Sequence, residues 1–204
     1  MQYPDFSYES AKHKQGLQLI AGVDEVGRGP WAGPVVSAAV ILDPNNLPEG
    51  VTDSKKLSPK KREALYDFIM QTADVSIAEA TVEEIDEINI REATFLAMTR
   101  ALEGLKNKPQ FAFIDGNAMP KDMFCPAETV VKGDLHVMSI AAASVVAKVY
   151  RDRMMAQLGE EFPHYGWERN AGYGVKAHQE GIASHGITPH HRRSFKPIRA
   201  YIEG

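Results

Sequence analysis

The sequence predicts one α/β domain in which a mixed β-sheet is flanked by helices. Three observations support this class: short apolar runs typical of buried strands, helix start signals between them, and enough hydrophobic residues for one core. The chain has 204 residues, of which 44% are hydrophobic, so we expect a single domain over 1–204. From about 160 to 204, glycines, prolines and histidines replace the regular pattern, which favours a helical and irregular C-terminal segment.

Four apolar runs predict strands. Residues 17–23 and 34–42 are separated by a glycine-rich turn, which indicates neighbouring antiparallel strands, with Asp24 ending the first. Residues 111–114 and 129–131 predict two short buried strands that end at or near an acidic residue.

Two helix start signals are explicit. Ser58 followed by Pro59 combines a capping residue with a proline at the first helical position, and apolar residues follow at helical spacing. Thr81 and Glu84 form a capping-box pattern before a second amphipathic helix, which we expect to run to Leu105.

Two further helices are expected later in the chain. The stretch from Met138 is rich in small residues, which would let a helix lie close against a sheet. A final short helix is expected over 175–184.

Charge and cysteine content limit the function classes. The net charge of −4 argues mildly against a nucleic-acid partner, but basic residues cluster over 55–62 and 192–199 while acidic residues gather over 74–92. Such runs are usually solvated faces, although two basic patches around an acidic centre would suit a nuclease. One cysteine, and no apolar stretch long enough for a signal peptide or membrane helix, lead us to expect a cytoplasmic protein.

The most informative motif joins two adjacent acids to a glycine-rich turn. Asp24 and Glu25 repel each other at close range, so a folded site that keeps both ionised needs a cation beside them. An isolated pair of this kind is more simply a solvated turn. Here Gly27, Arg28 and Gly29 follow, and they would let the backbone approach a ligand while the guanidinium clamps a phosphate.

Asp115 and Asp134 extend this interpretation. Each lies where a predicted strand stops or a helix is about to begin, and a mixed sheet could bring them to the same rim as Asp24 and Glu25. Taken singly, Asp115 is a turn residue and Asp134 a helix N-terminal residue. Together, four carboxylates favour Mg²⁺ or Mn²⁺, and no cysteine and histidine spacing indicates zinc.

The ordered motifs resemble those of bacterial ribonuclease HII, the type 2 ribonuclease H, over nearly the whole chain. They comprise Asp24-Glu25-Val26-Gly27-Arg28-Gly29-Pro30, Ala32-Gly33-Pro34-Val35-Val36, Asp53-Ser54-Lys55-Lys56-Leu57, Asp115-Gly116-Asn117, Lys132-Gly133-Asp134, Ser139 to Lys148, Gly172-Tyr173-Gly174 and His191-Arg192-Arg193-Ser194-Phe195. The resemblance implies a ribonuclease H-like fold with a central five-stranded mixed sheet.

The resemblance also implies the activity and the metal. It implies an endoribonuclease that hydrolyses the phosphodiester 5′ of ribonucleotides in RNA/DNA hybrids, and of single ribonucleotides in duplex DNA, leaving a 3′-hydroxyl and a 5′-phosphate. Asp24, Glu25, Asp115 and Asp134 become the catalytic, metal-binding acids of a two-metal-ion mechanism with Mn²⁺ or Mg²⁺. The sequence does not decide between these ions.

Substrate contacts follow from the same resemblance. The backbone of Gly27, Arg28 and Gly29 would detect the 2′-hydroxyl, and Tyr173 would stack on the neighbouring sugar, although a tyrosine between two glycines is equally a surface aromatic. Phosphate contacts are assigned to further basic residues, namely Lys55, Lys56, Arg192 and Arg193. The segment from about 160 to 204 would thus contact substrate. His190 and His191 are interpreted as structural or solvated.

Two positions depart from the family pattern. Trp31 stands where relatives commonly have leucine, and Val175 where threonine is usual. Trp31 would enlarge an apolar contact beside the turn or simply pack. The missing hydroxyl at Val175 leads to the hypothesis of weaker discrimination at RNA–DNA junctions.

Two other classes of function stay open. The first is a noncatalytic nucleic-acid-binding module whose acids hold a structural cation. The second is a nucleotide-binding enzyme, which the spacing disfavours because neither a P-loop nor a dinucleotide motif is present. We expect a monomer with no protein partner.

Overall fold

Five strands form one mixed sheet in the order β3-β2-β1-β4-β5. The computed structural model, which describes residues 3–203, places them at β1 (Ile20–Val26), β2 (Val35–Ile41), β3 (Asp74–Ala80), β4 (Phe111–Asp115) and β5 (Ala127–Val130). β2 is antiparallel to β1 and β3, whereas β4 is parallel to β1 and β5. The predicted five-stranded mixed sheet is confirmed, as is the antiparallel pairing of the first two strands.

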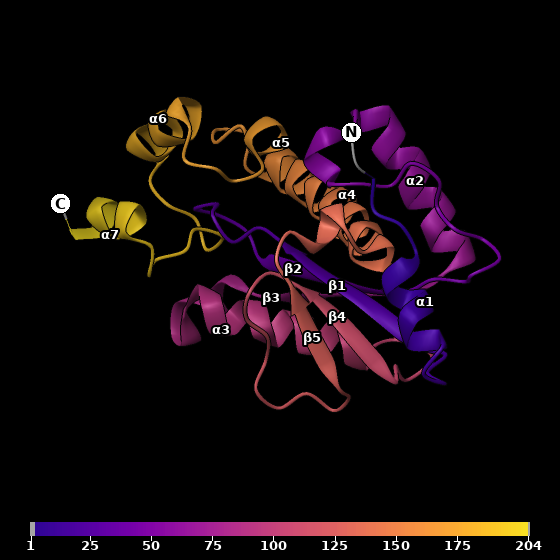
Figure 1. Ribbon diagram of the computed structural model, residues 1–204. Coiled ribbons are helices and arrows are strands. Elements are labelled where there is room, and N and C mark those ends of the chain that lie inside the picture. Colours follow the sequence, from indigo (N-terminus) through magenta and orange to yellow (C-terminus); the bar gives the residue numbers. More distant parts are fainter. Residues whose placement is uncertain (1–2, 204) are drawn as a thin grey trace.

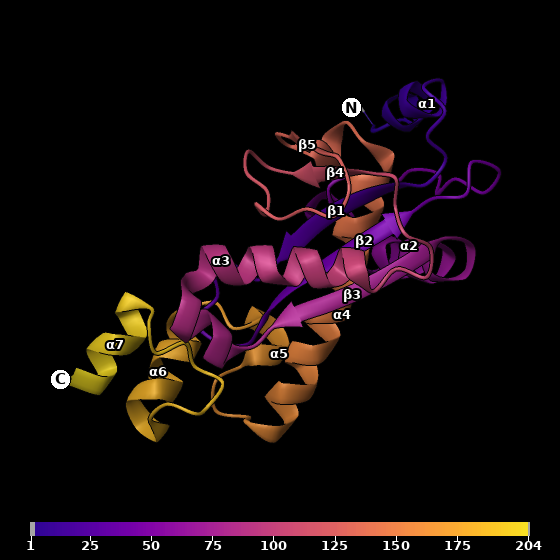
Figure 2. The same cartoon turned by 90° about the horizontal axis from the view of Figure 1, so that it is seen from below.

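Helices cover both faces of the sheet (Figure 1). They are α1 (Ser7–His13), α2 (Pro59–Thr72), α3 (Val82–Glu103), α4 (Met138–Glu161), α5 (Trp167–Asn170), α6 (Lys176–His185) and α7 (Lys196–Glu203), with short 3-10 turns η1 (Ser54–Lys56) and η2 (Gly133–Leu135). α3 packs on β2 and β3, and α4 packs on the opposite face against β1 and β2, as Figure 2 shows from below. α6 and α7 extend beyond one end of the sheet. Within residues 3–203, no helix is long and apolar enough to cross a membrane.

The predicted helix starts are confirmed in detail. The Ser58 hydroxyl accepts the Lys61 backbone N–H at 3.3 Å at the start of α2. Thr81 and Glu84 cap each other's backbone N–H at the start of α3. These side chains satisfy amides that have no partner within the helix. α3 ends at Glu103, two residues before the predicted end.

The structure corrects two expectations and adds one strand that the apolar runs did not predict. The first strand does not end at Asp24 but continues to Val26, so Asp24 and Glu25 lie within β1. β3 was not predicted, because its alternation is weak and its residues are mostly half-buried at the sheet edge. The helix expected over 175–184 is present as α6, but it is not the last, since α7 follows.

The close approach of α4 to β1 fixes the strand that carries two acids. The alanines and valines that begin α4 are buried against β1 and β2. A Cβ on Gly22 of β1 would overlap the backbone of Ser139 and Ile140. Only glycine therefore allows this strand to lie directly beneath the start of α4.

We expect Gly22→Ala to destabilise the fold by about 2 kcal/mol, because the added methyl group must push α4 away from β1. Chemical denaturation monitored by circular dichroism measures this change. An unaltered unfolding midpoint would contradict the packing described for β1 and α4.

Candidate active site

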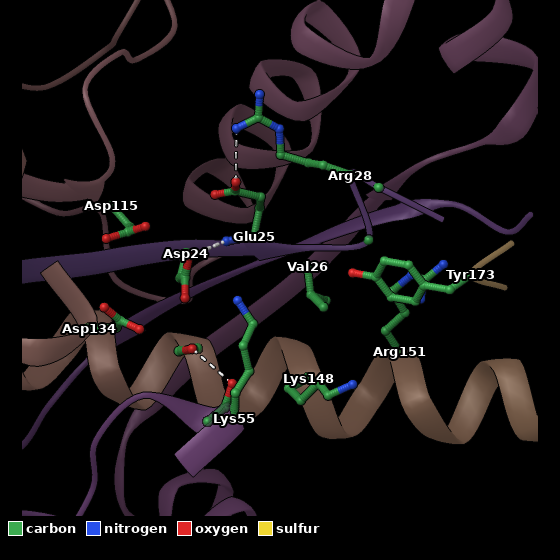
Figure 3. A pocket seen from close by; sticks show the side chains of 14 residues that line it. Asp24, Glu25, Val26, Arg28, Lys55, Asp115, Asp134, Lys148, Arg151 and Tyr173 are labelled. Atoms are coloured by element: carbon green, nitrogen blue, oxygen red, sulfur yellow. Dashed lines mark hydrogen bonds and ion pairs between the residues drawn. The ribbon is translucent and has the colours of Figure 1, made fainter. Parts of the chain in front are cut away.

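Carboxylates from three parts of the chain line one cleft of about 460 Å³ at the end of β1 and β4. The parallel register pairs Val23 with Ile114, so the following residues, Asp24 and Asp115, lie side by side. Carboxylate oxygens of Asp24, Glu25 and Asp115 lie within 4.8 Å of one another. Asp134 of η2 lines the same cleft but stands outside this group of three (Figure 3).

Asp24 is the most enclosed of these acids, with 7% of its surface exposed. Burial raises its pKa well above the usual value, and the nearby charges of Glu25 and Asp115 raise it further. Two donors oppose this effect: the Glu25 backbone N–H, 2.7 Å from Asp24 Oδ1, and the Ser144 hydroxyl. The Ser144 hydroxyl is itself 3.1 Å from the hydroxyl of Ser54.

The other acids share this crowding. Burial raises the pKa of Glu25, while the Arg28 guanidinium, 3.3 Å from its Oε1, lowers it. Burial also raises the pKa of Asp115, although its Oδ1 accepts the Gly133 N–H at 2.6 Å. The pKa of Asp134 is raised by burial and by the charge of Asp115.

This donor set fits hard divalent cations. Every candidate ligand atom is a carboxylate oxygen, and the acids resist ionisation in the absence of positive charge. A cation beside Asp24, Glu25 and Asp115 would offset the burial and the repulsion that raise the pKa values of these acids. The residues therefore suit Mg²⁺ or Mn²⁺ better than a soft transition metal.

The Gly-Arg-Gly turn forms the adjoining wall of the cleft, and its geometry requires glycine at Gly27 and leaves little room at Gly29. Gly27 has φ +95°, and a Cβ there would overlap the side chain of Arg151. A Cβ on Gly29 would lie only 3.3 Å from the ring of Tyr173. The turn thus packs closely against Arg151 at Gly27 and against Tyr173 at Gly29.

The structure corrects the expectation that Arg192 contacts phosphate. Its side chain is fully buried and donates to the carbonyls of Gly33, Arg28 and Gly27 at 2.9, 3.0 and 2.5 Å. Burial, with the charge of Arg151 nearby, lowers the pKa of Arg192 to about 9. Arg192 therefore holds the turn from inside the protein.

Arg151 of α4 supports the same loop from a second direction. Its guanidinium donates to the carbonyls of Pro34, Ala32 and Ala171 at 3.0, 3.1 and 2.9 Å. Burial lowers its pKa to about 10. Two buried arginines thus fix six carbonyl groups around the turn.

Only some of the remaining predicted substrate-binding residues line the cleft. Lys55 and Tyr173 line the cleft, with Tyr173 at the opposite end from the carboxylates (Figure 3). Lys56 is exposed and does not line it, although its charge partly opposes the burial that raises the pKa of Asp134. Arg193 lines a separate pocket with Ile182 and Tyr201, so a phosphate contact by Arg193 stays a prediction.

Three cleft residues of α4 were given no role in the sequence interpretation. Ser144, Lys148 and Arg151 all line the cleft and recur at helical spacing. The available signal was a serine and two cations that recur at helical spacing in and just after the apolar first half of α4.

The two departures from the family pattern lie next to Tyr173. Trp31 exchanges backbone hydrogen bonds with Gly172 and Arg192, both 2.8 Å, and its ring fills the space beside Gly174. Val175 is the N-cap of α6 and provides no side-chain hydrogen bond there. Packing thus accounts for Trp31, and α6 begins without a capping hydroxyl.

A five-stranded mixed sheet that gathers carboxylates beside a buttressed glycine-rich turn defines the ribonuclease H-like class of metal-dependent nucleases. The family model described as Ribonuclease HII matches residues 21–198. The chain belongs to the ribonuclease HII family and is an endoribonuclease. Curated relatives bear that name, and two of them illustrate the similarity. The protein of Ruegeria pomeroyi is 58% identical, and the alignment covers 99% of this chain and 86% of the relative. The protein of Paracoccus denitrificans is 52% identical, and the alignment covers 99% of this chain and 96% of the relative.

Solved structures agree with this assignment. Ribonuclease H2 from Pyrococcus horikoshii superposes with a TM-score of 0.77 at 30% identity, covering 90% of this chain and 97% of its own. RNase HII of Archaeoglobus fulgidus, solved in complex with PCNA, gives 0.73 at 30% identity, covering 87% and 95%. Bst-RNase HIII in complex with Mn²⁺ gives 0.72 at 20% identity, covering 95% and 72%, and shares the fold.

We expect Asp24→Asn to raise the Tm of the metal-free protein at pH 7. The raised pKa of Asp24 means that the folded state loses stability as pH rises above the ordinary carboxyl value, and a neutral amide avoids this loss. The gain should disappear below about pH 3.8, where the carboxyl group is protonated in both states. Differential scanning calorimetry across this pH range measures it.

The matched control is Asp67→Asn on the exposed face of α2, which should leave the Tm nearly unchanged. A lower Tm for Asp24→Asn at pH 7 would contradict the account of charge crowding in the cleft.

Proposed function

We propose that this enzyme cuts the phosphodiester on the 5′ side of a ribonucleotide, both in RNA/DNA hybrids and at single ribonucleotides in duplex DNA. The products would carry a 3′-hydroxyl and a 5′-phosphate. The observation that carries this proposal is the shared cleft, which Asp24, Glu25 and Asp115 line at one end and the Gly27–Gly29 turn and Tyr173 line beyond them. A phosphate held against the carboxylates would place its sugar beside that turn.

The acids act as ligands in this proposal. Asp24, Glu25, Asp115 and Asp134 hold divalent ions, either Mn²⁺ or Mg²⁺. When bound, the ions supply Lewis acidity that activates water and offsets the charge developing on the phosphate and the leaving oxygen. Ser144 and the Gly133 N–H keep Asp24 and Asp115 oriented.

The turn and Tyr173 select the sugar. Because Arg192 binds the carbonyls of Gly27 and Arg28, these groups cannot rotate toward the cleft. The backbone of Gly27, Arg28 and Gly29 would contact the 2′-hydroxyl, which distinguishes ribose from deoxyribose. Tyr173 would stack on the adjacent sugar. Lys55 would bind a neighbouring phosphate, and Lys56 would bind a phosphate further along the nucleic-acid strand.

The proposal includes partners and location. The enzyme would act in the cytoplasm as a monomer on ribonucleotide-containing duplexes, and the segment from about 160 to 204 would contact the substrate through Tyr173. The Archaeoglobus relative was solved with PCNA, so the absence of a protein partner stays a prediction for this chain.

The decisive assay uses a DNA duplex with one ribonucleotide, incubated with Mn²⁺, Mg²⁺ or EDTA. We expect a metal-dependent cut 5′ of the ribonucleotide, and a loss of at least about a hundredfold in kcat for Asp115→Asn, because a metal ligand is lost. Asp122→Asn, in the exposed β4–β5 loop, is the matched control and should cut at the wild-type rate. Binding without cleavage under every metal condition would favour the noncatalytic module instead.

Val175→Thr tests the missing capping hydroxyl. We expect a stability gain of about 1 kcal/mol, because a threonine at the N-cap can accept a backbone N–H of α6. If α6 also steadies Tyr173, the cleavage ratio of single-ribonucleotide to all-RNA substrate should rise. Val175→Ile, which keeps the branched shape without a hydroxyl, is the control. An unchanged cleavage ratio together with a raised Tm would contradict the hypothesis that the missing hydroxyl weakens discrimination at RNA–DNA junctions.

A further inference from the structure

Two buried imidazoles connect the backbone of Tyr173 to the segment that precedes Arg192. His178 lies on α6 and His191 lies in the loop after it, and neither side chain is exposed. Their Nε2 atoms are 3.1 Å apart. The indole N–H of Trp167 also donates to His178 Nε2, at 3.1 Å. Neither histidine lines the catalytic cleft.

The partner of His191 fixes its tautomer. The backbone N–H of Thr188 lies 2.9 Å from His191 Nδ1. Because an amide N–H can only donate, this nitrogen must accept, and the proton of the neutral ring is on Nε2. His191 therefore donates from Nε2 toward His178.

The tautomer of His178 follows from two partners. Its Nε2 accepts from His191 and from Trp167, whose indole nitrogen is a donor only. Its proton is consequently on Nδ1, which donates to the Tyr173 carbonyl at 3.0 Å. The hydrogen bonds thus run in one direction, from Thr188 through His191 and His178 to Tyr173. We call these four residues the histidine relay.

The histidine relay works only with both rings neutral. A further proton on either ring would place two N–H groups face to face, at Thr188 or between the imidazoles. Burial and the neighbouring His178 lower the pKa of His191 to about 4, and burial lowers the pKa of His178. The titratable groups facing the pair are the Tyr165 ring, which lies edge-on to both, and His190.

The histidine relay and Arg192 both start from residues 188–192. The histidine relay leads to Tyr173, and Arg192 leads to the Gly27–Gly29 turn. The Tyr173 carbonyl is held by His178 and by the Val175 N–H at 2.8 Å, while its ring stays about half exposed beside Gly29. Arg192, the residue after His191, holds the carbonyls of Gly27 and Arg28. Residues 188–192 therefore connect the Tyr173 backbone to the turn, alongside Arg151 and the hydrogen bond from Trp31 N–H to the Gly172 carbonyl.

We propose that His178 and His191 are positioning residues that set the gap between Tyr173 and the Gly27–Gly29 turn, and so govern selection of the ribose. This inference rests on the proposed function of the same cleft. It assigns no direct contact with substrate to either histidine. It predicts that breaking the histidine relay impairs substrate use through Tyr173 and leaves the carboxylates unaffected.

Two amide substitutions at His178 separate the two ends of the ring. His178→Asn places an amide nitrogen near the former Nδ1 and keeps a donor for Tyr173. His178→Gln places its amide near the former Nε2 and loses that donor. On a DNA duplex with one ribonucleotide, we expect His178→Gln to lower kcat/KM about tenfold, mainly through KM, and His178→Asn to stay within about threefold. Equal losses for the two variants would overturn the proposal.

A double-mutant cycle with Tyr173→Ala distinguishes failure of the histidine relay from failure of the proposed function. If His178 acts through Tyr173, His178→Gln should cost little once the tyrosine ring is absent. A full tenfold additional loss in the Tyr173→Ala background would reject the histidine relay while leaving the function intact. Wild-type kcat/KM for Tyr173→Ala would reject the role of Tyr173 and, with it, the histidine relay. No cleavage by the wild type would reject the proposed function itself.

Nitrogen-15 NMR of the unsubstituted protein provides a test that does not depend on a variant folding. At pH 6.5 we expect His178 protonated at Nδ1 and His191 at Nε2, with both rings neutral. Either opposite tautomer, or a His191 that titrates at the ordinary value of 6.5, would contradict the histidine relay.

Discussion

Repulsion between buried carboxylates is the constraint on which the cleft depends. The parallel pairing of β1 with β4 brings Asp24 beside Asp115, and Glu25 follows on the same strand, with oxygens of all three within 4.8 Å. Burial raises the pKa of each acid, and the charge of Asp115 raises the pKa of Asp24 and of Glu25 further. The fold supplies the Gly133 N–H, Ser144 and Arg28 as partial compensation. Divalent cations would supply the positive charge that these groups do not.

Two buried arginines keep the Gly27–Gly29 turn rigid without adding negative charge to the cleft. Arg151 and Arg192 are buried against backbone carbonyls, so the Gly27–Gly29 turn is fixed from inside the protein. A guanidinium suits this role because its planar array of donors can bind several carbonyls at once. The C-terminal segment is therefore part of the cleft's construction, through Arg192 on one wall and Tyr173 on the other.

The sequence was informative where a local pattern determines the structure. The caps at Ser58 and Thr81 and the apolar strands were predictable because each depends on neighbouring residues. β3 was missed because an edge strand that is only half-buried carries a weak apolar signal. The burial of Arg192 depends on Gly33, 159 residues away, and no local pattern encodes such a contact. The clustering of the acids was anticipated from their order, but their separation required the strand register.

The most direct test of this account is the number of protons released when Mn²⁺ binds at pH 7, measured by calorimetry in two buffers with different ionisation enthalpies. Because burial and the neighbouring charges raise the pKa of Asp24 well above its usual value, we predict net proton release on binding, with a smaller release for Asp24→Asn. Mn²⁺ binding without proton release, or equal release from both proteins, would contradict the central role of the crowded carboxylates.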